Sequence, residues 1–388
     1  MPSKVLLASA RATVWEHSHS LPARLEALLS AADVARYVSK GDYTAVKLHF
    51  GSRGAYRVVR PVFLRKIVEA ARAAGGLPFV TDTTRIPGLE YFEVAAANGF
   101  THLTCGAPVV LADGLFGRDS VQVRVENARF VEEIGVASAI YDAPAMIVVS
   151  HCKGHIGPGF GGAIKNLAMG GVGVRRRDGT TNRGHLHTIE NVPPHWREEN
   201  CTWCRRCEDV CPKDAITMGS GEYWEIAEAL CDRCGRCVRI CPADALHMPM
   251  TQERFARGMA EATKAVLSTF APGKVLYVNF VLEVQPECDC MPMADTPIVQ
   301  DQGIVISDDI VAVDQASLDL INRAAPLPQS KAFDKGIREA GEDLLDRVTG
   351  RNTQLSIVAA EEMGLGSRDY ELVTVEPVTT GASPWDED

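Results

Sequence analysis

The chain has 388 residues, 46% of them hydrophobic and 23% charged, a composition typical of a globular protein with room for two or three domains. A formal net charge of −10 argues against binding to nucleic acid or to an anionic membrane surface, and no apolar run reaches the roughly 18–20 residues of a membrane span. The first residues lack a secretory signal, so we expect a cytoplasmic protein, in which twelve cysteines favour metal binding over a disulfide framework.

The first half of the chain alternates predicted helices with predicted strands. Helical periodicity covers 21–38 and 60–76, and the second of these segments has a proline near its start and two glycines at its end. Three short apolar segments are typical of buried strands: 43–51, 77–83 and 143–150. This alternation predicts an α/β domain with a mainly parallel sheet.

Polar residues near two of these strands are candidates for a cofactor-binding site. Lys47 and His49 share one face of the strand at 43–51, because side chains alternate along a strand. Asp82 stands at the end of the strand at 77–83, where open α/β sheets bind their ligands. For each of these residues the alternative is a purely structural role.

A glycine-rich stretch, SHCKGHIGPGFGGAIKN, follows the strand at 143–150 and leads into a predicted helix at 163–170. Glycines let the backbone approach a ligand, and the N–H groups of a helix start favour an anion. We predict that an anionic substrate or a flavin binds here and is protonated by His151, Lys153, His155 and Lys165. The predicted cofactor-binding residues of the stretch are Gly157, Gly159, Gly161, Gly162 and Asn166.

Two alternatives apply to the same stretch. It could be a compact loop whose lysines face water. Three of its glycines also fit the G-x-G-x-x-G fingerprint of dinucleotide-binding folds, but six residues separate the preceding strand from the first of them, where that fingerprint needs a tight turn.

The strongest motif is a duplicated cysteine pattern. Residues 201–212 read CTWCRRCEDVCP and residues 231–242 read CDRCGRCVRICP, so each copy is Cys-x2-Cys-x2-Cys-x3-Cys-Pro. The pattern resembles that of bacterial-type ferredoxins with two [4Fe-4S] clusters, in which the fourth cysteine of each copy ligates the other cluster. The resemblance assigns one cluster to Cys201, Cys204, Cys207 and Cys241, and the other to Cys231, Cys234, Cys237 and Cys211. Zinc is the alternative, but its sites favour two separated Cys-x2-Cys pairs.

Cationic residues surround both copies of the motif. They favour the reduced form of a cluster and suit docking to an acidic partner protein or an anionic small molecule. Their alternative role is solvation or pairing with neighbouring carboxylates. The residues are Arg205, Arg206, Lys213, Arg233, Arg236 and Arg239.

Strand and helix patterns resume after the cysteine motif. A strand is predicted at 274–284, and 303–324 is typical of a strand that enters a helix capped by Asp308 or Asp309. Strands on both sides favour a ferredoxin unit inserted in one larger domain over two α/β halves joined by it. The predicted boundaries are 1–195 and 251–330 for the α/β domain, 196–250 for the α+β ferredoxin-type insertion, and 331–388 for a C-terminal helical and strand extension with an acidic tail.

A second group of cysteines lies outside the duplicated motif. The segment ECDCMP places Cys288 and Cys290 on either side of Asp289, just past a predicted strand. Together with Cys152 they are candidates for a further metal site or a redox pair, and the alternative is a set of free thiols. Cys105 has no partner in the sequence and is predicted in the core.

Several motifs together resemble the family of uncharacterised iron–sulfur centre proteins known as domain of unknown function 362. They are KLHFG, GFTHL, SHCKGH, FGGAIKN, the cysteine insert, CDC and SDDIVAVDQASLD, and they cover about residues 43–325. The resemblance implies two [4Fe-4S] clusters and a larger domain of unassigned chemistry, without a substrate. The α/β organisation also resembles the nickel-dependent lactate racemase domain, which is a likeness of fold alone.

Three functions are compatible with these features. The first is an iron–sulfur oxidoreductase that passes single electrons through the clusters to an anionic substrate or flavin bound by the loop 151–166. The second is a ferredoxin-like electron carrier that docks an electron-donor or acceptor protein. The third is a metal-centre maturation protein. We expect the first, because a carrier alone has no need of about 300 further residues with clustered polar groups.

Overall fold

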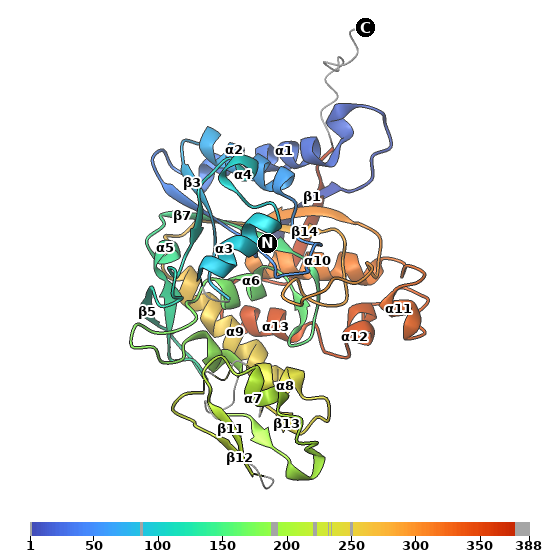
Figure 1. Ribbon diagram of the computed structural model, residues 1–388. Coiled ribbons are helices and arrows are strands. Elements are labelled where there is room, and N and C mark those ends of the chain that lie inside the picture. The colour runs from blue at the N-terminus through green and yellow to red at the C-terminus, as the bar shows by residue number, and fades with distance from the viewer. Residues whose placement is uncertain are drawn as a thin grey trace.

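The computed structural model describes residues 2–85, 88–187, 193–219, 223–231, 233, 235–248 and 251–376. An eight-stranded sheet runs through its larger part, and a smaller unit with the cysteine motif lies at one end (Figure 1). Helices cover both faces of the sheet. Within the described ranges, every helix is too short or too polar to traverse a lipid bilayer.

The large sheet is mainly parallel. Across the sheet, the strands follow the order β16 (Tyr370–Thr374), β1 (Ser3–Ser9), β15 (Gly303–Ser307), β14 (Val275–Val281), β7 (Ala145–His151), β2 (Tyr43–Lys47), β3 (Leu77–Asp82) and β4 (Val109–Leu111). The pairs from β14 through to β4 are parallel, as is β1 with β16, whereas β15 runs antiparallel to both of its neighbours. The predicted α/β fold with a mainly parallel sheet is therefore confirmed.

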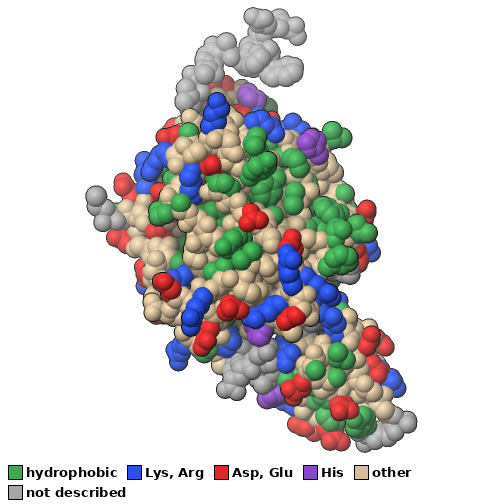
Figure 2. All heavy atoms as spheres, turned by 90° about the vertical axis from the view of Figure 1, so that its left-hand side faces the viewer, with side chains coloured by type: hydrophobic (Ala, Val, Ile, Leu, Met, Phe, Trp, Pro, Cys, Tyr) green, Lys and Arg blue, Asp and Glu red, His purple; other side chains and the backbone are tan. Residues whose placement is uncertain are grey.

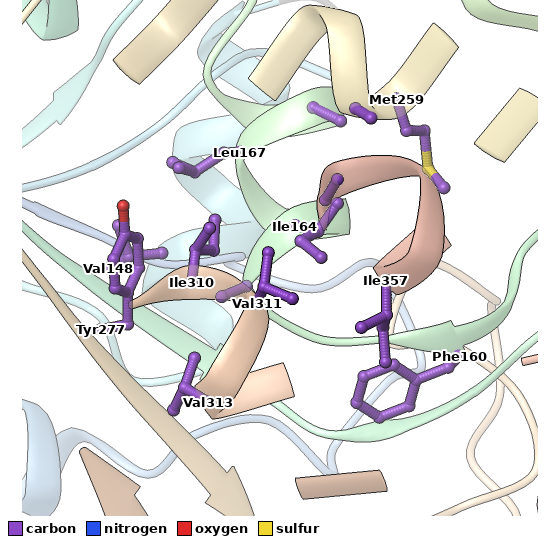
Figure 3. Close-up of a cluster of buried hydrophobic side chains, with 14 of the residues drawn as sticks. Val148, Phe160, Ile164, Leu167, Met259, Tyr277, Ile310, Val311, Val313 and Ile357 are labelled. Carbon is purple, nitrogen blue, oxygen red and sulfur yellow. The ribbon is translucent and has the colours of Figure 1, made fainter. Parts of the chain in front are cut away.

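Residues 145–149 of strand β7 are all apolar because both faces of this strand are buried. Alternate side chains of a strand point to opposite faces, so Ile147 packs into one hydrophobic cluster and Val148 into the other. The cluster with Ile147 is formed with α1 (Leu21–Ala31), α2 (Pro61–Ala73), α3 (Gly88–Ala97) and α4 (His102–Cys105). The cluster with Val148, shown in Figure 3, is formed with α5 (Ser138–Tyr141), α6 (Ala163–Gly170), α9 (Gln252–Leu267), α10 (Ile310–Arg323), α11 (Lys331–Asp334), α12 (Leu344–Thr349) and α13 (Leu355–Glu362).

Local signals in the sequence explain where several elements begin. Helix α2 starts at Pro61, where the missing N–H of proline costs nothing. Helix α10 follows β15, and its N-cap is Asp309, whose carboxylate accepts the N–H groups of Val311 and Ala312 at 2.9 Å. Strand β1 was not predicted from the sequence pattern. It lies between β15 and β16, so segments before and after the cysteine motif share one sheet.

The glycine-rich stretch forms a hairpin between β7 and α6. Its strands are β8 (Lys153–His155) and β9 (Gly159–Gly161), and Lys153 pairs with Gly161. A second antiparallel pair outside the large sheet joins β5 (Ser120–Arg124) to β6 (Glu133–Ala137). Short 3-10 turns occur at His17–His19, Val34–Arg36, Arg183–His187 and Glu198–Asn200.

The cysteine motif folds into a small α+β unit that projects from the sheet domain beside the start of α9 (Figure 1). The unit pairs β10 (His195–Trp196) with β13 (Leu246–His247) and β11 (Ile216–Gly219) with β12 (Tyr223–Ile226), and it contains α7 (Arg206–Asp209) and α8 (Arg236–Ile240). It has a hydrophobic core of its own, formed by Cys207, Ile216, Met218, Cys237 and Leu246. Its ferredoxin-type identity stays a prediction.

Candidate active site and cysteine cavities

The carboxyl ends of three neighbouring strands meet at the candidate active site. Strand β2 ends at Lys47, β3 at Asp82 and β7 at His151. From β2 the chain crosses to β3 on one side, and from β7 it crosses to β14 on the other. Open α/β sheets bind ligands at such a point, because the connections diverge there and leave a crevice.

Asp82 is the centre of a buried polar cluster. One carboxylate oxygen accepts a hydrogen bond from Nζ of Lys47 at 2.9 Å. The other accepts from Nδ1 of His49 at 2.9 Å and from the hydroxyl of Tyr91 at 2.6 Å. Burial alone would raise the pKa of Asp82, but the charge of Lys47 and the hydrogen bond from His49 hold this pKa well below its usual range. Asp82 is therefore a carboxylate at neutral pH.

Lys47 and Asn166, both predicted to bind a cofactor, brace β2 against α6. The ammonium of Lys47 also donates to the carbonyl of Leu48 at 3.1 Å and to Oδ1 of Asn166 at 2.5 Å, so its three N–H groups have three acceptors. A Cβ at Gly170 would lie 2.1 Å from Nζ of Lys47, which makes a side chain at Gly170 incompatible with this contact. No N–H of Lys47 is left for a ligand.

His49, in contrast to Lys47, keeps one polar atom without a partner among the described residues. Burial outweighs the attraction of Asp82 and lowers the pKa of His49 to about 4, so its ring is neutral at pH 7. The proton lies on Nδ1, because Nδ1 faces the carboxylate of Asp82. The other nitrogen, Nε2, is buried and has no hydrogen-bond partner among the described residues. His49 can therefore accept a proton at Nε2.

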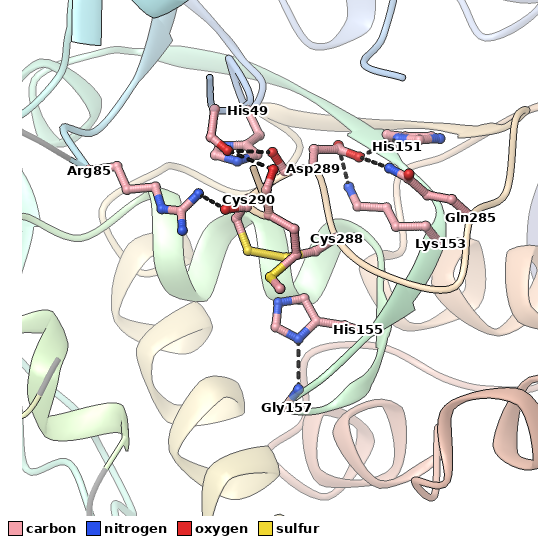
Figure 4. The surroundings of a disulfide bond; sticks show 12 residues. His49, Arg85, His151, Lys153, His155, Gly157, Gln285, Cys288, Asp289 and Cys290 are labelled. Atoms are coloured by element: carbon pink, nitrogen blue, oxygen red, sulfur yellow. Dashed lines mark hydrogen bonds and ion pairs between the residues drawn. A yellow bond between two sulfur atoms is a disulfide. The ribbon is translucent and has the colours of Figure 1, made fainter. Parts of the chain in front are cut away.

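Asp289 forms a second carboxylate cluster (Figure 4). It accepts hydrogen bonds from Nζ of Lys153 at 2.8 Å, from Nδ1 of His151 at 2.9 Å and from Nε2 of Gln285 at 3.0 Å. Burial would raise the pKa of Asp289, but His151 and Lys153 hold it well below its usual range. Nε2 of His151 donates to the carbonyl of Leu282 at 2.8 Å. The predicted catalytic residues His151 and Lys153 are thus occupied by the protein itself.

Lys165 is a cation with no ion-pair or hydrogen-bond partner in the part of the chain that the structure describes. Burial, together with the charges of Lys153 and Arg85, lowers the pKa of Lys165 to about 7. Arg85 donates an N–H of its guanidinium to the main-chain carbonyl of Cys290. An anion bound beside Lys165 would relieve the repulsion among these cations.

Cys288 and Cys290, which are candidates for a further metal site or a redox pair, form a disulfide. A ring nitrogen of His155 lies within 4.8 Å of both sulfurs. Figure 4 shows the ring between the disulfide and Gly157, whose N–H donates to Nδ1 at 2.9 Å. Cys152 does not join them. It lies in the hydrophobic core, where burial raises the pKa of its thiol.

The start of α6 holds a carboxylate of the chain where an external anion was predicted. The N–H groups of Ala163 and Ile164 donate to the carboxylate of Asp314 at 2.7 and 3.0 Å. A Cβ at Gly162 would lie 2.3 Å from the same carboxylate, and a Cβ at Gly159 would lie 2.8 Å from a neighbouring side chain. These glycines permit close packing within the protein.

Two cavities lie in the small unit. The lining of one includes Cys201, Cys204, Cys207 and Cys241. The lining of the other includes Cys211, Cys231 and Cys237. Cys234 lies outside the described residues. Each cavity thus combines cysteines of one repeat with the fourth cysteine of the other.

The two repeats share an unusual backbone. Six of their residues have φ between 48° and 67°, the left-handed region that non-glycine residues rarely adopt. They form three pairs that are 30 positions apart in the sequence, Trp203 with Arg233, Arg205 with Gly235, and Asp214 with Asp244. Left-handed residues turn successive N–H groups to one side, which wraps a loop around an anionic group.

Main-chain N–H groups also point at the fourth cysteine of each repeat. The N–H of Ala215 donates to Sγ of Cys211 at 3.3 Å, and the N–H of Ala245 donates to Sγ of Cys241 at 3.2 Å. Hydrogen bonds to sulfur stabilise a thiolate ligand and raise the potential of an attached iron–sulfur cluster. The duplication therefore extends from the cysteines to their hydrogen bonds.

Sequence patterns missed several residues that shape the site around β2, β3 and β7. Tyr91 and Arg85 had no motif to mark them. Asp314 carried a usable signal, because it interrupts an apolar helix on a side that is buried. A carboxylate in such a position needs a partner, and here the partner is the start of α6.

The fold and the site define an α/β protein with buried carboxylate clusters at the switch point of its sheet and a cysteine-rich unit beside it. The chain belongs to the family described as Domain of unknown function (DUF362), whose model matches residues 44–319. One similar solved structure is that of the lactate racemase apoprotein from Thermoanaerobacterium thermosaccharolyticum. It is 11% identical, with a TM-score of 0.39 over 96% of this chain and 83% of that chain, and this likeness carries no functional argument. A search of curated proteins finds no match.

Proposed function

We propose that the chain is an iron–sulfur oxidoreductase that passes single electrons through two [4Fe-4S] clusters to an anionic substrate beside Lys165. The pair of cysteine cavities carries this proposal. Their linings bring together cysteines of both repeats, which is the ligand exchange of two-cluster ferredoxins. Zinc sites favour two separated Cys-x2-Cys pairs, whereas each repeat of this chain has four closely spaced cysteines.

The surroundings of the cysteines suit such clusters. Apolar side chains, among them Ile216, Ile226 and Trp224, line the cavities and limit the access of water to the sulfurs. The N–H groups of Ala215 and Ala245 stabilise negative charge on sulfur. When bound, the clusters supply one-electron transfer at a potential tuned by these contacts.

Residues of the sheet domain bind the substrate, exchange a proton with it and hold the site in place. Lys165 binds a carboxylate or phosphate of the substrate, because it has no ion-pair or hydrogen-bond partner among the described residues and the charges of Lys153 and Arg85 make its surroundings more positive. His49 exchanges a proton with the substrate at Nε2, while Asp82 holds the ring in the required tautomer. Asp289, Lys153 and His151 keep the opposite wall of the site in place.

Anaerobic purification followed by iron and sulfide analysis tests the proposal. The wild type should contain about eight irons and about eight acid-labile sulfides per chain, and Cys207→Ser should contain about half of each. Cys105→Ser is the matched control, since Cys105 is buried in the sheet domain and should leave the iron content unchanged. Zinc in place of iron would contradict the proposal, and mass spectrometry of released molecules would show whether a flavin is the acceptor.

A ferredoxin-like carrier is the second candidate function. The observation that favours it is the exposure of Cys204 on a unit that protrudes from the molecule as a separate lobe (Figure 2). A cluster near such a surface is accessible to a partner protein. Transfer of electrons to another protein with steep salt dependence, unaltered by Lys165→Met, would support the carrier over the oxidoreductase.

A further inference from the structure

We propose that Cys288 and Cys290 are a reversible redox pair, which takes up two electrons beside the anion site. The inference deepens the proposed function, since it names a group of this chain that receives the electrons. It depends on the proposed function only for the source of these electrons. The position of the disulfide and of its neighbours supports the inference independently of that function.

The disulfide lies at the carboxyl edge of the sheet, where a redox group could exchange electrons with a ligand of the candidate active site. Cys288 is buried and Cys290 is partly buried, on the segment that follows β14 at the carboxyl edge of the sheet. Figure 4 shows the disulfide among His155, Arg85 and the Asp289 cluster. Neighbouring cations favour a thiolate over a thiol, so they favour the reduced state of the pair.

His155 is oriented as a hydrogen-bond donor to the sulfurs. The N–H of Gly157 donates to Nδ1, which must therefore carry a lone pair. Burial and the charges of Lys165 and Lys153 lower the pKa of His155 well below its usual value, so the ring is neutral and its one proton lies on Nε2. Figure 4 places the disulfide on the side of the ring opposite Gly157, so Nε2–H faces the sulfurs.

The same tautomer argues against a metal at this position. His155, Cys288 and Cys290 are close enough to be ligands of one metal ion. A metal, however, needs the lone pair of a ring nitrogen, and here Nδ1 is occupied by Gly157 while Nε2 carries the proton. A thiolate needs the N–H that Nε2 provides.

The loop is anchored so that the S–S bond can open without loss of structure. Asp289, between the two cysteines, is fixed by Lys153, His151 and Gln285. The hydroxyl of Ser52 donates to the carbonyl of Asp289 at 3.3 Å and to that of Met291 at 2.9 Å. These contacts do not involve the sulfurs, and they remain after reduction.

The chemical balance is that of a disulfide reduction. Two electrons enter and the S–S bond breaks. Two protons from water then convert the sulfurs to thiols, with the first thiolate held by Nε2–H of His155. In the proposed function the electrons arrive singly, and two one-electron centres together hold the number that one disulfide requires.

Thiol labelling of the anaerobic protein in dithiothreitol redox buffers tests the inference. Mass spectrometry should show Cys288 and Cys290 becoming alkylated together, in one two-electron transition. His155→Ala should shift the dithiol–disulfide equilibrium about tenfold toward the disulfide, which is about 30 mV for a two-electron couple. His155→Gln restores an N–H donor and should return the equilibrium to the wild-type value. His102→Ala is the control, because His102 is an exposed histidine on α4.

Several outcomes would overturn the inference. They are a pair that dithiothreitol cannot reduce, a pair that stays reduced in oxidising buffer, an equilibrium unmoved by His155→Ala, and stoichiometric Zn²⁺ bound by the reduced pair. The buffer reduces the pair directly, so this titration is independent of iron. A chain without iron whose pair still titrates would refute the proposed function and leave the redox pair intact.

Discussion

The sheet-edge site and the cysteine unit satisfy their polar groups in opposite ways. At the sheet edge, Asp82 and Asp289 are each surrounded by donors from the chain itself. In the cysteine unit, thiols line two cavities, and main-chain N–H groups such as that of Ala215 donate hydrogen bonds to sulfur. The two carboxylates of the sheet edge are therefore matched within the chain, whereas the thiols of the cysteine unit surround two cavities.

Whether a buried polar group has partners within the chain distinguishes residues that hold the site together from residues that can contact a ligand. A buried charge without a partner is costly, so a lysine whose N–H groups are all used, such as Lys47, belongs to the framework. Lys165 and Nε2 of His49 lack partners among the described residues, and these groups are the ones that remain for a ligand.

The largest effect is expected from breaking the network around Asp82. Asp82→Ala would leave Lys47 buried without its carboxylate and should lower the free energy of unfolding by about 3–5 kcal/mol. Urea denaturation followed by circular dichroism measures this. Glu69→Ala is the control, because Glu69 forms exposed ion pairs on α2 and its removal should cost less than about 1 kcal/mol. Equal costs for the two variants would contradict the assignment.

A pH effect of intermediate size is expected from His49. Because its folded pKa of about 4 lies below the unfolded value, its contribution to stability is present near neutral pH and is lost as the pH falls toward 4. Between pH 7 and pH 5 the wild type should lose up to about 2 kcal/mol more than His49→Gln does. Urea midpoints at both pH values measure the difference. The exposed His102→Gln should behave as the wild type.

Anion binding at Lys165 should also depend on pH, but here the affinity should decrease as the pH rises. Lys165 loses its proton near pH 7, so the affinity for sulfate should fall about tenfold between pH 6 and pH 8. Isothermal titration calorimetry measures this, and Lys165→Met should bind sulfate weakly at both pH values. The exposed Lys40→Met is the matched control. An affinity that does not change with pH would contradict the role of Lys165.

The smallest effect concerns the backbone of the cysteine unit. Gly235 has φ of 67°, and Gly235→Ala places a side chain in the left-handed region at a cost of about 1 kcal/mol. The urea concentration at which cluster absorbance disappears should fall accordingly. Arg205→Gly, at the equivalent position of the first repeat, should change this concentration little or raise it. A larger loss in Arg205→Gly would mean that the guanidinium contact with Glu208 outweighs the backbone effect.

The sequence predicted local elements and motifs in both regions, but not the contacts between distant segments. Hydrophobic periodicity predicted α6 at its observed bounds of Ala163 to Gly170 and the strands that carry Lys47 and Asp82. The assignment of the cysteines to two clusters came from one repeated local pattern, and it stays a prediction. The pairing of Asp289 with Lys153 was not, because more than a hundred residues separate them and only the order of the strands brings them together.

The glycine-rich stretch shows a second limit of sequence patterns. Its composition correctly indicates a start of α6 that attracts negative charge, and the structure supplies Asp314 from α10. A pattern of glycines and lysines cannot distinguish a carboxylate of the chain from one of a ligand. The position of α10 beside α6 is decided by the packing of the whole hydrophobic cluster.

Strand β1 consists of residues Ser3–Ser9, yet both of its neighbours, β15 and β16, are encoded more than 290 residues later. During synthesis this strand leaves the ribosome more than 290 residues before its two neighbours and keeps its backbone donors and acceptors unmatched until they emerge. A nascent chain therefore exposes an edge suited to wrong partners throughout that interval, and chaperone capacity should govern its yield more than the stability of the finished molecule does.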